Sequence, residues 1–477
     1  MIKDVLKTQE NANPNYLATI CKIESTFPIE GADRLVKTVI NGYDIVISKD
    51  MQVGDVVIYI PVESTICNDF LSRNNLYELS CYEKNANHNE IDNLKLQLDD
   101  TNKNDINNQI KSKCGFFNKH GRVRMIKLRG QYSMGYIIPW KQFIDTFGLE
   151  LEPEIGYRFN MVNDIEFCTK YIPIQSNKPN NHVGTGSGNK ANKKLKRFDK
   201  LIPGTFEFHY DTKQLGEHID VLEPLDSVSV TVKVHGTSGI FSRLPIRKEL
   251  TLFDKIKKFF GIKVQETEMG NIYSSRKVIK NQYINKNVGD GFYKNDVWGE
   301  VNKIIEPLLD DNMTIYGEIV GYVPCTQTYI QKNHDYGCKP GEWKFMPYRI
   351  NECGREWDVK DVINWTITHI ETYPELKQYL MPMTLLYYGR VKDLYSIIDT
   401  NDPNWRNVFL TFLKNDAIRF GMELDEPLCK NKVPREGIVI RINGDQFNRA
   451  WKLKTMRHYG IEAEQHDKGE VDMEELG

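Results

Sequence analysis

A lysine at the end of an alternating run is the first residue whose position suggests chemistry. In SVSVTVKVHGTSG, residues 227–239, valines alternate with Ser, Thr and Lys233, and small residues follow. Side chains alternate across a β-strand, so the run predicts a strand with its valine face in a core and Lys233 on the polar face. Small and hydroxyl-bearing residues after it let a phosphate approach backbone N–H groups. A lone lysine is most often a solvated charge, so its partners along the chain decide its meaning.

Two carboxylates and two more lysines occur in strand-like context further along the chain. Glu318 lies in the alternating run TIYGEIVG, and Glu436 precedes the β-branched run GIVIRI. Lys452 and Lys454 share one face of a third strand, where their like charges repel unless an anionic ligand lies between them. This set of five residues predicts a site that binds phosphate groups.

The chemistry that fits such a set is nucleotidyl transfer. A deprotonated amine can attack an α-phosphate, and neighbouring cations favour that protonation state. Carboxylates bind Mg²⁺, which neutralises phosphate oxygens. A lysine pair offsets the charge that develops on the α-phosphate and on the pyrophosphate leaving group.

These residues resemble the motifs of the covalent nucleotidyltransferase superfamily, which contains the ATP-dependent ligases and RNA capping enzymes. The matching residues, in chain order, are Lys233-Val-His235-Gly236, Tyr316-Gly317-Glu318, Glu436-Gly437 and Lys452-Leu453-Lys454. A histidine two residues after the lysine is similar to the RNA ligase branch, since DNA ligases and capping enzymes usually have aspartate there. Four other segments resemble the RNA ligase 5 family, in which an N-terminal OB module precedes the nucleotidyltransferase domain: FPIEGADRL, GDVVIYIPVES, GRVRMIKLRGQYSMGYIIP and FEFHYDT.

The resemblance implies an ATP-dependent RNA ligase that uses Mg²⁺ or Mn²⁺ and seals 3′-OH/5′-phosphate breaks. Lys233 would form a lysyl-AMP, AMP would pass to the 5′-phosphate, and the 3′-OH would displace it. Lys452 and Lys454 would hold the α-phosphate, and Glu318 and Glu436 would serve the ribose or the metal. The residues implied to line the nucleotide pocket are Val232, His235, Gly236, Ser238, Arg276, Glu318, Phe345 and Glu436.

Three of these positions need a comment. The aromatic that stacks on adenine is assigned to Phe345, with Tyr348 as the other candidate. Related RNA ligases often have Glu immediately before the nucleophile and Asn after His-Gly-Thr, where this chain has Val232 and Ser238. The serine hydroxyl still donates and accepts hydrogen bonds.

The expected fold is a multidomain α+β protein. An N-terminal OB-type β-barrel precedes a nucleotidyltransferase domain of the ligase (ATP-grasp-like) type, built from antiparallel sheets and helices. The segments expected are an OB domain at 1–165 with an Asn-rich, partly disordered insert at 82–113, a flexible basic linker at 166–200, the adenylyltransferase domain at 201–458 and an acidic, frayed tail at 459–477. Asn41-Gly42 between two apolar runs predicts a hairpin, and apolar spacing from Val297 to Leu308 predicts a helix.

The OB module is expected to bind the nucleic acid, which would be nicked or broken RNA, paired with RNA or DNA. Its basic residues on exposed strand faces are Arg122, Arg124, Lys127 and Arg129. Such stripes suit a phosphate backbone, although basic residues on a barrel surface are also common without one.

Composition excludes some classes of protein. A net charge of -2 over 477 residues makes any basic surface local. No run of about 18 apolar residues occurs, so no membrane partner is expected. Nine scattered cysteines without a CxxC pair favour reduced thiols in the cytoplasm over a disulfide framework.

Two other functions remain open from the sequence. One is a DNA ligase or a capping guanylyltransferase. The other is a nucleic-acid-binding protein with a remnant ligase domain, which retention of all five charged residues argues against.

Overall fold

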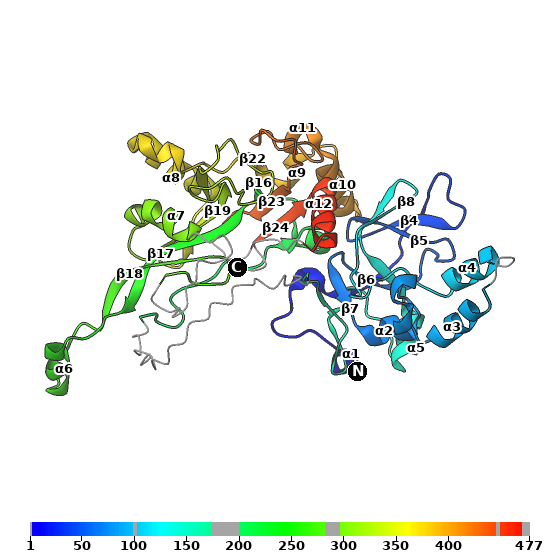
Figure 1. The fold of residues 1–477 in the computed structure, drawn as a ribbon. Helices are drawn as coiled ribbons and strands as arrows, with labels where there is room; N and C mark the ends of the chain where they lie inside the picture. The colour runs from blue at the N-terminus through cyan, green and yellow to red at the C-terminus, as the bar shows by residue number, and fades with distance from the viewer. Residues whose placement is uncertain (1, 99–102, 174–199, 282–295, 445–448, 470–477) are drawn as a thin grey trace. The chain divides into compact units, whose positions relative to one another are not determined.

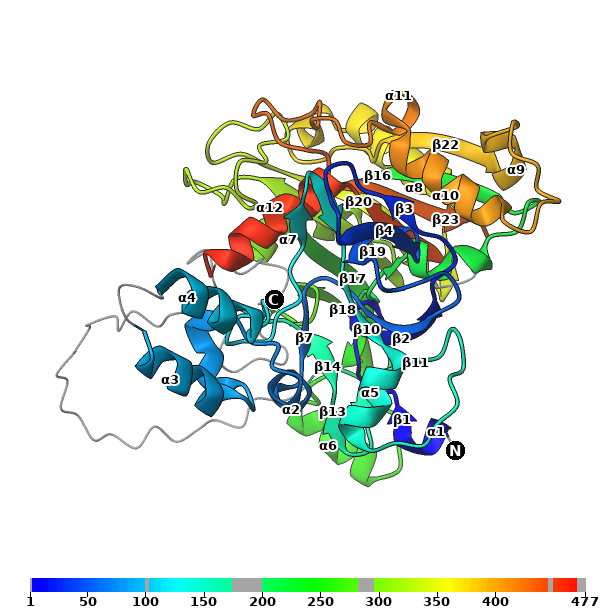
Figure 2. The same ribbon diagram turned by 90° about the vertical axis from the view of Figure 1, so that its right-hand side faces the viewer.

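The computed structural model describes residues 2–98, 103–173, 200–281, 296–444 and 449–469 (Figures 1 and 2). The chain divides into two compact units. The first comprises Met1–Ile174, Gly216–His218 and Tyr459–Lys468, and the second comprises Gln175–Leu215, Ile219–His458 and Gly469–Gly477. The expected linker falls largely on 174–199, outside the described residues.

The first unit is built mainly from short strands. Its strands are β1 (Leu6–Lys7), β2 (Ala18–Lys22), β3 (Phe27–Pro28), β4 (Leu35–Ile40), β5 (Tyr43–Ser48), β6 (Val56–Ile60), β7 (Ser64–Ile66), β8 (Ile126–Leu128), β9 (Gln131–Ser133), β10 (Tyr136–Pro139), β11 (Arg158–Phe159), β12 (Met161–Val162), β13 (Ile165–Glu166) and β14 (Cys168–Lys170). The central sheet has the order β10-β6-β2-β11, and β3-β4-β5 form a separate antiparallel sheet. Among the described residues these ladders do not close into one hydrogen-bonded barrel, so the expected closure is wrong.

The predicted hairpin at Asn41-Gly42 is confirmed. It joins β4 to β5, with Ile40 opposite Tyr43. Asn41 has φ 51° and Gly42 has φ 74°, and two consecutive positive φ angles are what a two-residue type I′ turn requires.

Helices of the first unit pack around its strands or form the insert. They are α1 (Ile2–Val5), η1 (Pro14–Tyr16), α2 (Asn68–Arg73), η2 (Leu79–Lys84), α3 (His88–Leu96), α4 (Lys103–Ser112) and α5 (Trp140–Phe147). The insert was expected to be partly disordered, and its described residues form two helices, α3 and α4. Ile91 of α3 packs against Ile106 and Ile110 of α4, and this small apolar cluster gives each helix a buried face.

Arg122 corrects both the expected basic stripe and the expected tail. The residue is 2% exposed, and its guanidinium makes two hydrogen bonds to Glu63, at 2.9 and 2.7 Å. His466 also pairs with Glu63, and Asp467 lies 2.8 Å from Arg122. Both come from α12 (Met456–Asp467), so residues expected to fray form a helix up to Asp467. A buried arginine bound to two carboxylates is not available to a phosphate backbone.

The second unit contains two five-stranded sheets that carry the predicted motifs. We call one the Lys233 sheet; its order is β15 (Lys213–Gln214), β24 (Ala450–Lys454), β23 (Gly437–Ile442), β16 (Ser227–Lys233) and β22 (Leu385–Arg390). The other is the Glu318 sheet, with the order β18 (Thr267–Ser274), β17 (Thr237–Arg247), β19 (Met313–Gly321), β20 (Trp343–Glu352) and β21 (Arg355–Glu356). All neighbouring strands are antiparallel except β15 and β24.

Helices cover one face of each sheet. Those of this unit are η3 (Gly216–Val221, shared with the first unit), α6 (Leu252–Phe259), α7 (Val297–Ile305), η4 (Glu306–Leu308), α8 (Val359–Thr372), η5 (Pro374–Gln378), α9 (Val391–Leu394), α10 (Trp405–Asn415) and α11 (Ala417–Phe420). Apolar residues of α10 pack with Val228 and Val230 of β16, which confirms the predicted valine face (Figure 2). The predicted helix is α7, and it packs with α8 on the Glu318 sheet (Figure 1).

The described residues hold no helix with the length and apolarity needed to cross a bilayer. All nine cysteines are free thiols.

Candidate active site

Lys233 lies on the face of β16 opposite the helices. Alternation places Val228 and Val230 in the core, so Ser229, Thr231 and Lys233 point the other way. The Lys233 ammonium is 2.9 Å from Oε1 of Glu436, and its side chain is 20% exposed. The amine therefore reaches solvent while remaining paired with a carboxylate.

Strand register brings Glu436 and Lys454 to the same place. Gly437 opposes Lys233 on one side and Lys454 on the other, so the two lysines flank the start of β23. A Cβ at Gly437 would meet the carbonyl oxygen of Leu453 at 2.1 Å, so this position requires glycine. The Lys454 ammonium lies 3.2 Å from Oε1 of Glu436.

Glu436 is a buried anion. Burial alone would raise the pKa of its carboxyl, but Lys233, Lys454 and then His458 outweigh burial and hold the pKa well below its usual range. The carboxylate thus stays charged and fixes both ammonium groups.

Glu318 holds the backbone that follows Lys233. Its Oε1 accepts a hydrogen bond of 3.1 Å from the N–H of Gly236, and Gln331 donates to the Gly236 carbonyl at 2.8 Å. A Cβ at Gly236 would lie 2.3 Å from the Ile319 carbonyl oxygen. The indole of Trp298 donates to the carbonyl of Ser238 at 2.9 Å. These contacts explain why small residues follow the lysine.

Lys452 and Arg276 are two further basic residues beside Lys233 and Lys454. Burial, Lys454 and Lys233 lower the pKa of Lys452 to about 7, with a further contribution from Arg276. Arg276 forms an ion pair with Asp211. Burial would raise the pKa of Asp211, but Arg276 outweighs it and the pKa is lowered. Four basic side chains thus gather with two carboxylates, an arrangement that suits an anionic ligand.

The structure contradicts the assignment of Phe345 as the aromatic that stacks on a nucleobase. Its side chain is fully buried in the core beneath the Glu318 sheet and makes an edge contact with Phe241, with ring centroids 5.1 Å apart. Tyr348, three residues further on, is half-buried beside the ring of His209 at 5.3 Å. The register of β19 against β20 shifts between Tyr316, which opposes Arg349, and Gly317, which opposes Pro347, so Tyr348 is the extra residue of a β-bulge on β20. The sequence pattern did not show this bulge.

The remaining predicted residues lie as follows. Val232 and Ser238 are buried on β16 and β17. In the first unit, Lys127 on β8 and Arg129 in the turn after it are exposed, and Arg124 is half-buried.

Sequence reasoning gave Asp211, His334 and His458 no part in this site. His458 is fully buried, with its Nε2 3.7 Å from Oε1 of Glu436, and His334 packs edge-on against His235 with ring centroids 4.8 Å apart. Only tertiary structure brings these histidines to the motif residues.

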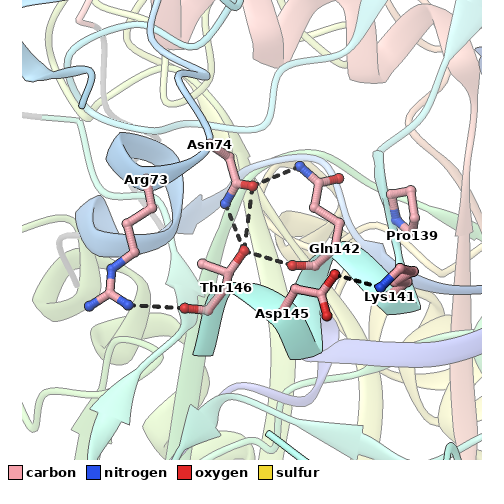
Figure 3. Close-up of a pocket in the computed structure, with 7 residues that line it drawn as sticks. All are labelled: Arg73, Asn74, Pro139, Lys141, Gln142, Asp145 and Thr146. Carbon is pink, nitrogen blue, oxygen red and sulfur yellow. Dashed lines mark hydrogen bonds and ion pairs between the residues drawn. The ribbon is translucent and has the colours of Figure 1, made fainter. Parts of the chain in front are cut away.

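A surface pocket lies apart from these residues, in the first unit (Figure 3). Its side chains bind one another: Gln142 donates to Asn74 at 3.0 Å, Arg73 donates to the Thr146 carbonyl at 3.0 Å, and Lys141 pairs with Asp145 at 2.9 Å. The polar groups are thus satisfied locally, and no prediction falls on this pocket.

Comparisons with known proteins bear on the fold. A family model described as an OB-fold domain matches residues 17–98. No similar sequence was found among curated proteins. Among solved structures, a mutant of Naegleria gruberi RNA ligase with ATP and Mn has a TM-score of 0.51 at 16% identity, covering 94% of this chain and 99% of that chain.

Two further structures of the Naegleria gruberi enzyme are similar to the same degree. A mutant with AMP and Mn has a TM-score of 0.51 and the enzyme with PPi has 0.50, each at 16% identity and covering 95% of this chain and 99% of that chain. The chain therefore has an OB fold at its N-terminus followed by antiparallel sheets and helices arranged as in an RNA ligase.

Proposed function

We propose that this protein is an ATP-dependent RNA ligase that joins 3′-OH and 5′-phosphate ends through a lysyl-AMP on Lys233. The observation that carries the proposal is the pairing of Lys233 with Glu436, within a group of four basic side chains in a ligase-like fold. The similar Naegleria gruberi RNA ligase structures contain ATP, AMP, PPi and Mn, and those ligands match the chemistry that these residues suit.

In the first step the Nζ lone pair of Lys233 attacks the α-phosphorus of ATP. A P–N bond forms, the bond from phosphorus to the bridging oxygen breaks, and pyrophosphate leaves. The amine must lose a proton to solvent first, because the low pKa of Glu436 makes its carboxylate a poor acceptor. The carboxylate, 2.9 Å away, holds the amine in position. Lys452 and Lys454 offset the charge that develops on the phosphate oxygens.

Glu318 acts by positioning. Because its carboxylate holds the Gly236 N–H, the backbone after Lys233 is fixed where the nucleotide must lie. Arg276, held by Asp211, would contact the ribose or the incoming 5′-phosphate.

The proposed Mg²⁺ or Mn²⁺ fits the oxygen donors of Glu318 and Glu436, since carboxylates are the ligands these ions prefer. When bound with ATP it would neutralise phosphate oxygens.

The next two steps transfer AMP to the 5′-phosphate and then release it. The 5′-phosphate oxygen attacks the adenylate phosphorus, which frees Lys233 and makes a 5′-5′ pyrophosphate linkage. The 3′-OH then attacks the 5′-phosphorus, forms the phosphodiester bond and expels AMP. Lys127 and Arg129 of the OB unit are exposed and suit contacts with the strand backbone.

The first prediction tests the nucleophile. Incubation with ATP labelled at the α-phosphate and Mg²⁺ or Mn²⁺ should label the protein through a bond stable to alkali and labile to acid, as a phosphoramidate is. Lys233→Ala should abolish the label, and Lys392→Ala, at an exposed lysine of the same unit, should retain it. Label mapped to another side chain, or none with either ion, would contradict the proposal. Label from GTP alone would indicate a capping enzyme instead.

A further inference from the structure

Three buried histidines surround Glu436, and two of them have no part in the proposed reaction. The exposed fractions of His235, His334 and His458 are 7%, 3% and 0%. The ring of His235 makes edge contacts with both other rings, with centroids 4.8 Å apart in each pair. The proposed adenylation uses lysines and gives His334 and His458 no role, so their burial beside Glu436 needs another explanation.

The ring nitrogens face the carboxylate at distances longer than hydrogen bonds. Nδ1 of His235 is 3.6 Å from Oε2 of Glu436, and Nε2 of His458 is 3.7 Å from Oε1. One donor atom from each residue lies within 4.8 Å of the others. Bonds of about 2 Å to a tetrahedral Zn²⁺ place its ligands about 3.4 Å apart. Small side-chain shifts would therefore close these three donors around one ion.

We propose that His235, Glu436 and His458 form a binding site for a transition-metal ion of the Zn²⁺ or Co²⁺ type. Two imidazoles and a carboxylate suit these ions, whereas Mg²⁺ prefers a shell of oxygens. The site shares Glu436 with the one proposed for the ion that accompanies ATP, and its two imidazoles set it apart in donor chemistry. Three protein ligands leave a fourth position open.

A third buried imidazole, that of His334, lies beside the trio and makes an edge contact with the ring of His235. Its Nδ1 lies 2.9 Å from the Lys332 carbonyl, which fixes the proton there. Its buried Nε2 has no hydrogen-bond partner among the described residues, so a lone pair remains beside the trio.

The lysines and the metal compete for Glu436. Lys233 and Lys454 both contact Oε1, so a dication bound there must displace or repel them. This coupling is reciprocal. If a bound metal ion weakens protonation of Lys233 by some factor, then loss of that proton strengthens metal binding by the same factor. If the proposed function holds, Zn²⁺ inhibits lysyl-AMP formation, and the adenylated enzyme, in which this amine is uncharged, binds the ion more tightly.

The test uses the full-length, untagged, metal-stripped protein without ATP. Titration with Co²⁺, followed by visible absorption and by calorimetry, should show one ion per chain with the strong absorption of tetrahedral Co²⁺, displaced by Zn²⁺. His458→Gln should weaken binding at least about tenfold. His369→Gln, at a histidine of α8, should leave binding unchanged. Lys233→Met should strengthen binding about tenfold, within the usual range of coupling between sites.

Two results would overturn the proposal. One is the absence of stoichiometric Co²⁺ binding by the wild-type protein. The other is equal affinity in wild type and His458→Gln. Thermal unfolding checks each variant, and if His458→Gln does not fold, His235→Asn takes its place. Lys233→Met removes none of the three proposed metal ligands. Unchanged or weaker Co²⁺ binding by this variant would therefore contradict the proposed competition between Lys233 and the metal for Glu436. Because no nucleotide is present, failure here leaves the self-labelling test of the ligase untouched.

Discussion

At the scale of single residues, Glu436 organises the charges of the candidate site. Oε1 accepts from both Lys233 and Lys454, while Oε2 faces His235. A buried carboxylate between two ammonium groups holds them in fixed positions that free lysine side chains would not keep. The same arrangement concentrates positive charge where a triphosphate would bind.

Lys452 gives the second prediction, which concerns pH. Its pKa is lowered to about 7, so in the free protein at pH 8 the amine is mostly neutral. A bound polyphosphate favours the charged form, so binding of an ATP analogue with a methylene bridge between its α- and β-phosphates should take up protons at pH 8. Calorimetry in two buffers of different ionisation enthalpy measures this uptake. It should be larger in the wild type than in Lys452→Met.

The control for this measurement is Lys392→Met, at an exposed lysine. Equal proton uptake in wild type and Lys452→Met would contradict the assignment of the lowered pKa to Lys452.

The pH dependence of stability should follow from the same lowered pKa of Lys452. The pKa is lower in the folded protein than the ordinary 10.5, so the unfolded chain binds more protons between about pH 7 and pH 10.5, and this contribution to the free energy of unfolding rises with pH across that window.

At the scale of elements, strand register and buried ion pairs decide which residues meet. Glu63, Arg122 and His466 join the segment before α2, the segment before β8 and the end of α12 inside the first unit. The side chain of Glu63 is 9% exposed and that of Arg122 is 1% exposed. Water therefore cannot replace a lost partner.

The third prediction follows from this pair. Arg122→Met should lower the free energy of unfolding by about 3 kcal/mol, because it leaves a buried carboxylate without its main partner. Lys127→Met, at an exposed lysine nearby, should change it by less than about 0.5 kcal/mol. Urea unfolding followed by circular dichroism compares the two. Similar small losses in both would mean that Arg122 is not held as the structure places it.

Helix α6 gives the fourth prediction. It lies at the far end of the β17–β18 hairpin (Figure 1), and Leu252, Phe253 and Phe259 are 80%, 65% and 86% exposed. Replacing residues 250–263 by a two-residue turn removes no packed core, so self-labelling with ATP should stay within about twofold and stability within about 0.5 kcal/mol. A loss of labelling beyond tenfold would show that α6 supports the site.

At the scale of the whole molecule, the described motif residues all belong to the second unit, and the exposed basic residues of β8 belong to the first. The proposed division of labour is chemistry in one unit and backbone binding in the other. This division can be tested in the intact chain. Deleting one unit would cut α12, because its residues are divided between the two units.

The fifth prediction uses charge reversal. Lys127→Glu combined with Arg129→Glu should raise the KM for a nicked RNA duplex about tenfold and reduce its salt dependence, while self-labelling stays unchanged. End-joining assays at two salt concentrations measure the effect. The matched control is the same reversal at Lys258 and Lys263, far along the hairpin. Equal loss of labelling and joining would indicate damage to the fold rather than a substrate contact.

The sequence by itself determined the strand that ends in Lys233, the hairpin at Asn41-Gly42 and the helix that became α7. Alternation, turn chemistry and helical spacing are local properties, so each can be inferred within a short window. It also singled out Glu318 and Glu436, since a charged residue within a β-branched run is conspicuous.

Only the tertiary structure decided which side chains are buried and with whom. Arg122 became an internal partner of Glu63, Phe345 became core, and His458 came to lie beside Glu436. Each outcome depends on a partner remote in the chain or on a bulge that shifts the register, and neither leaves a periodic trace in the sequence. Burial and pairing are properties of the assembled sheets and helices, because they arise from contacts that no short segment contains.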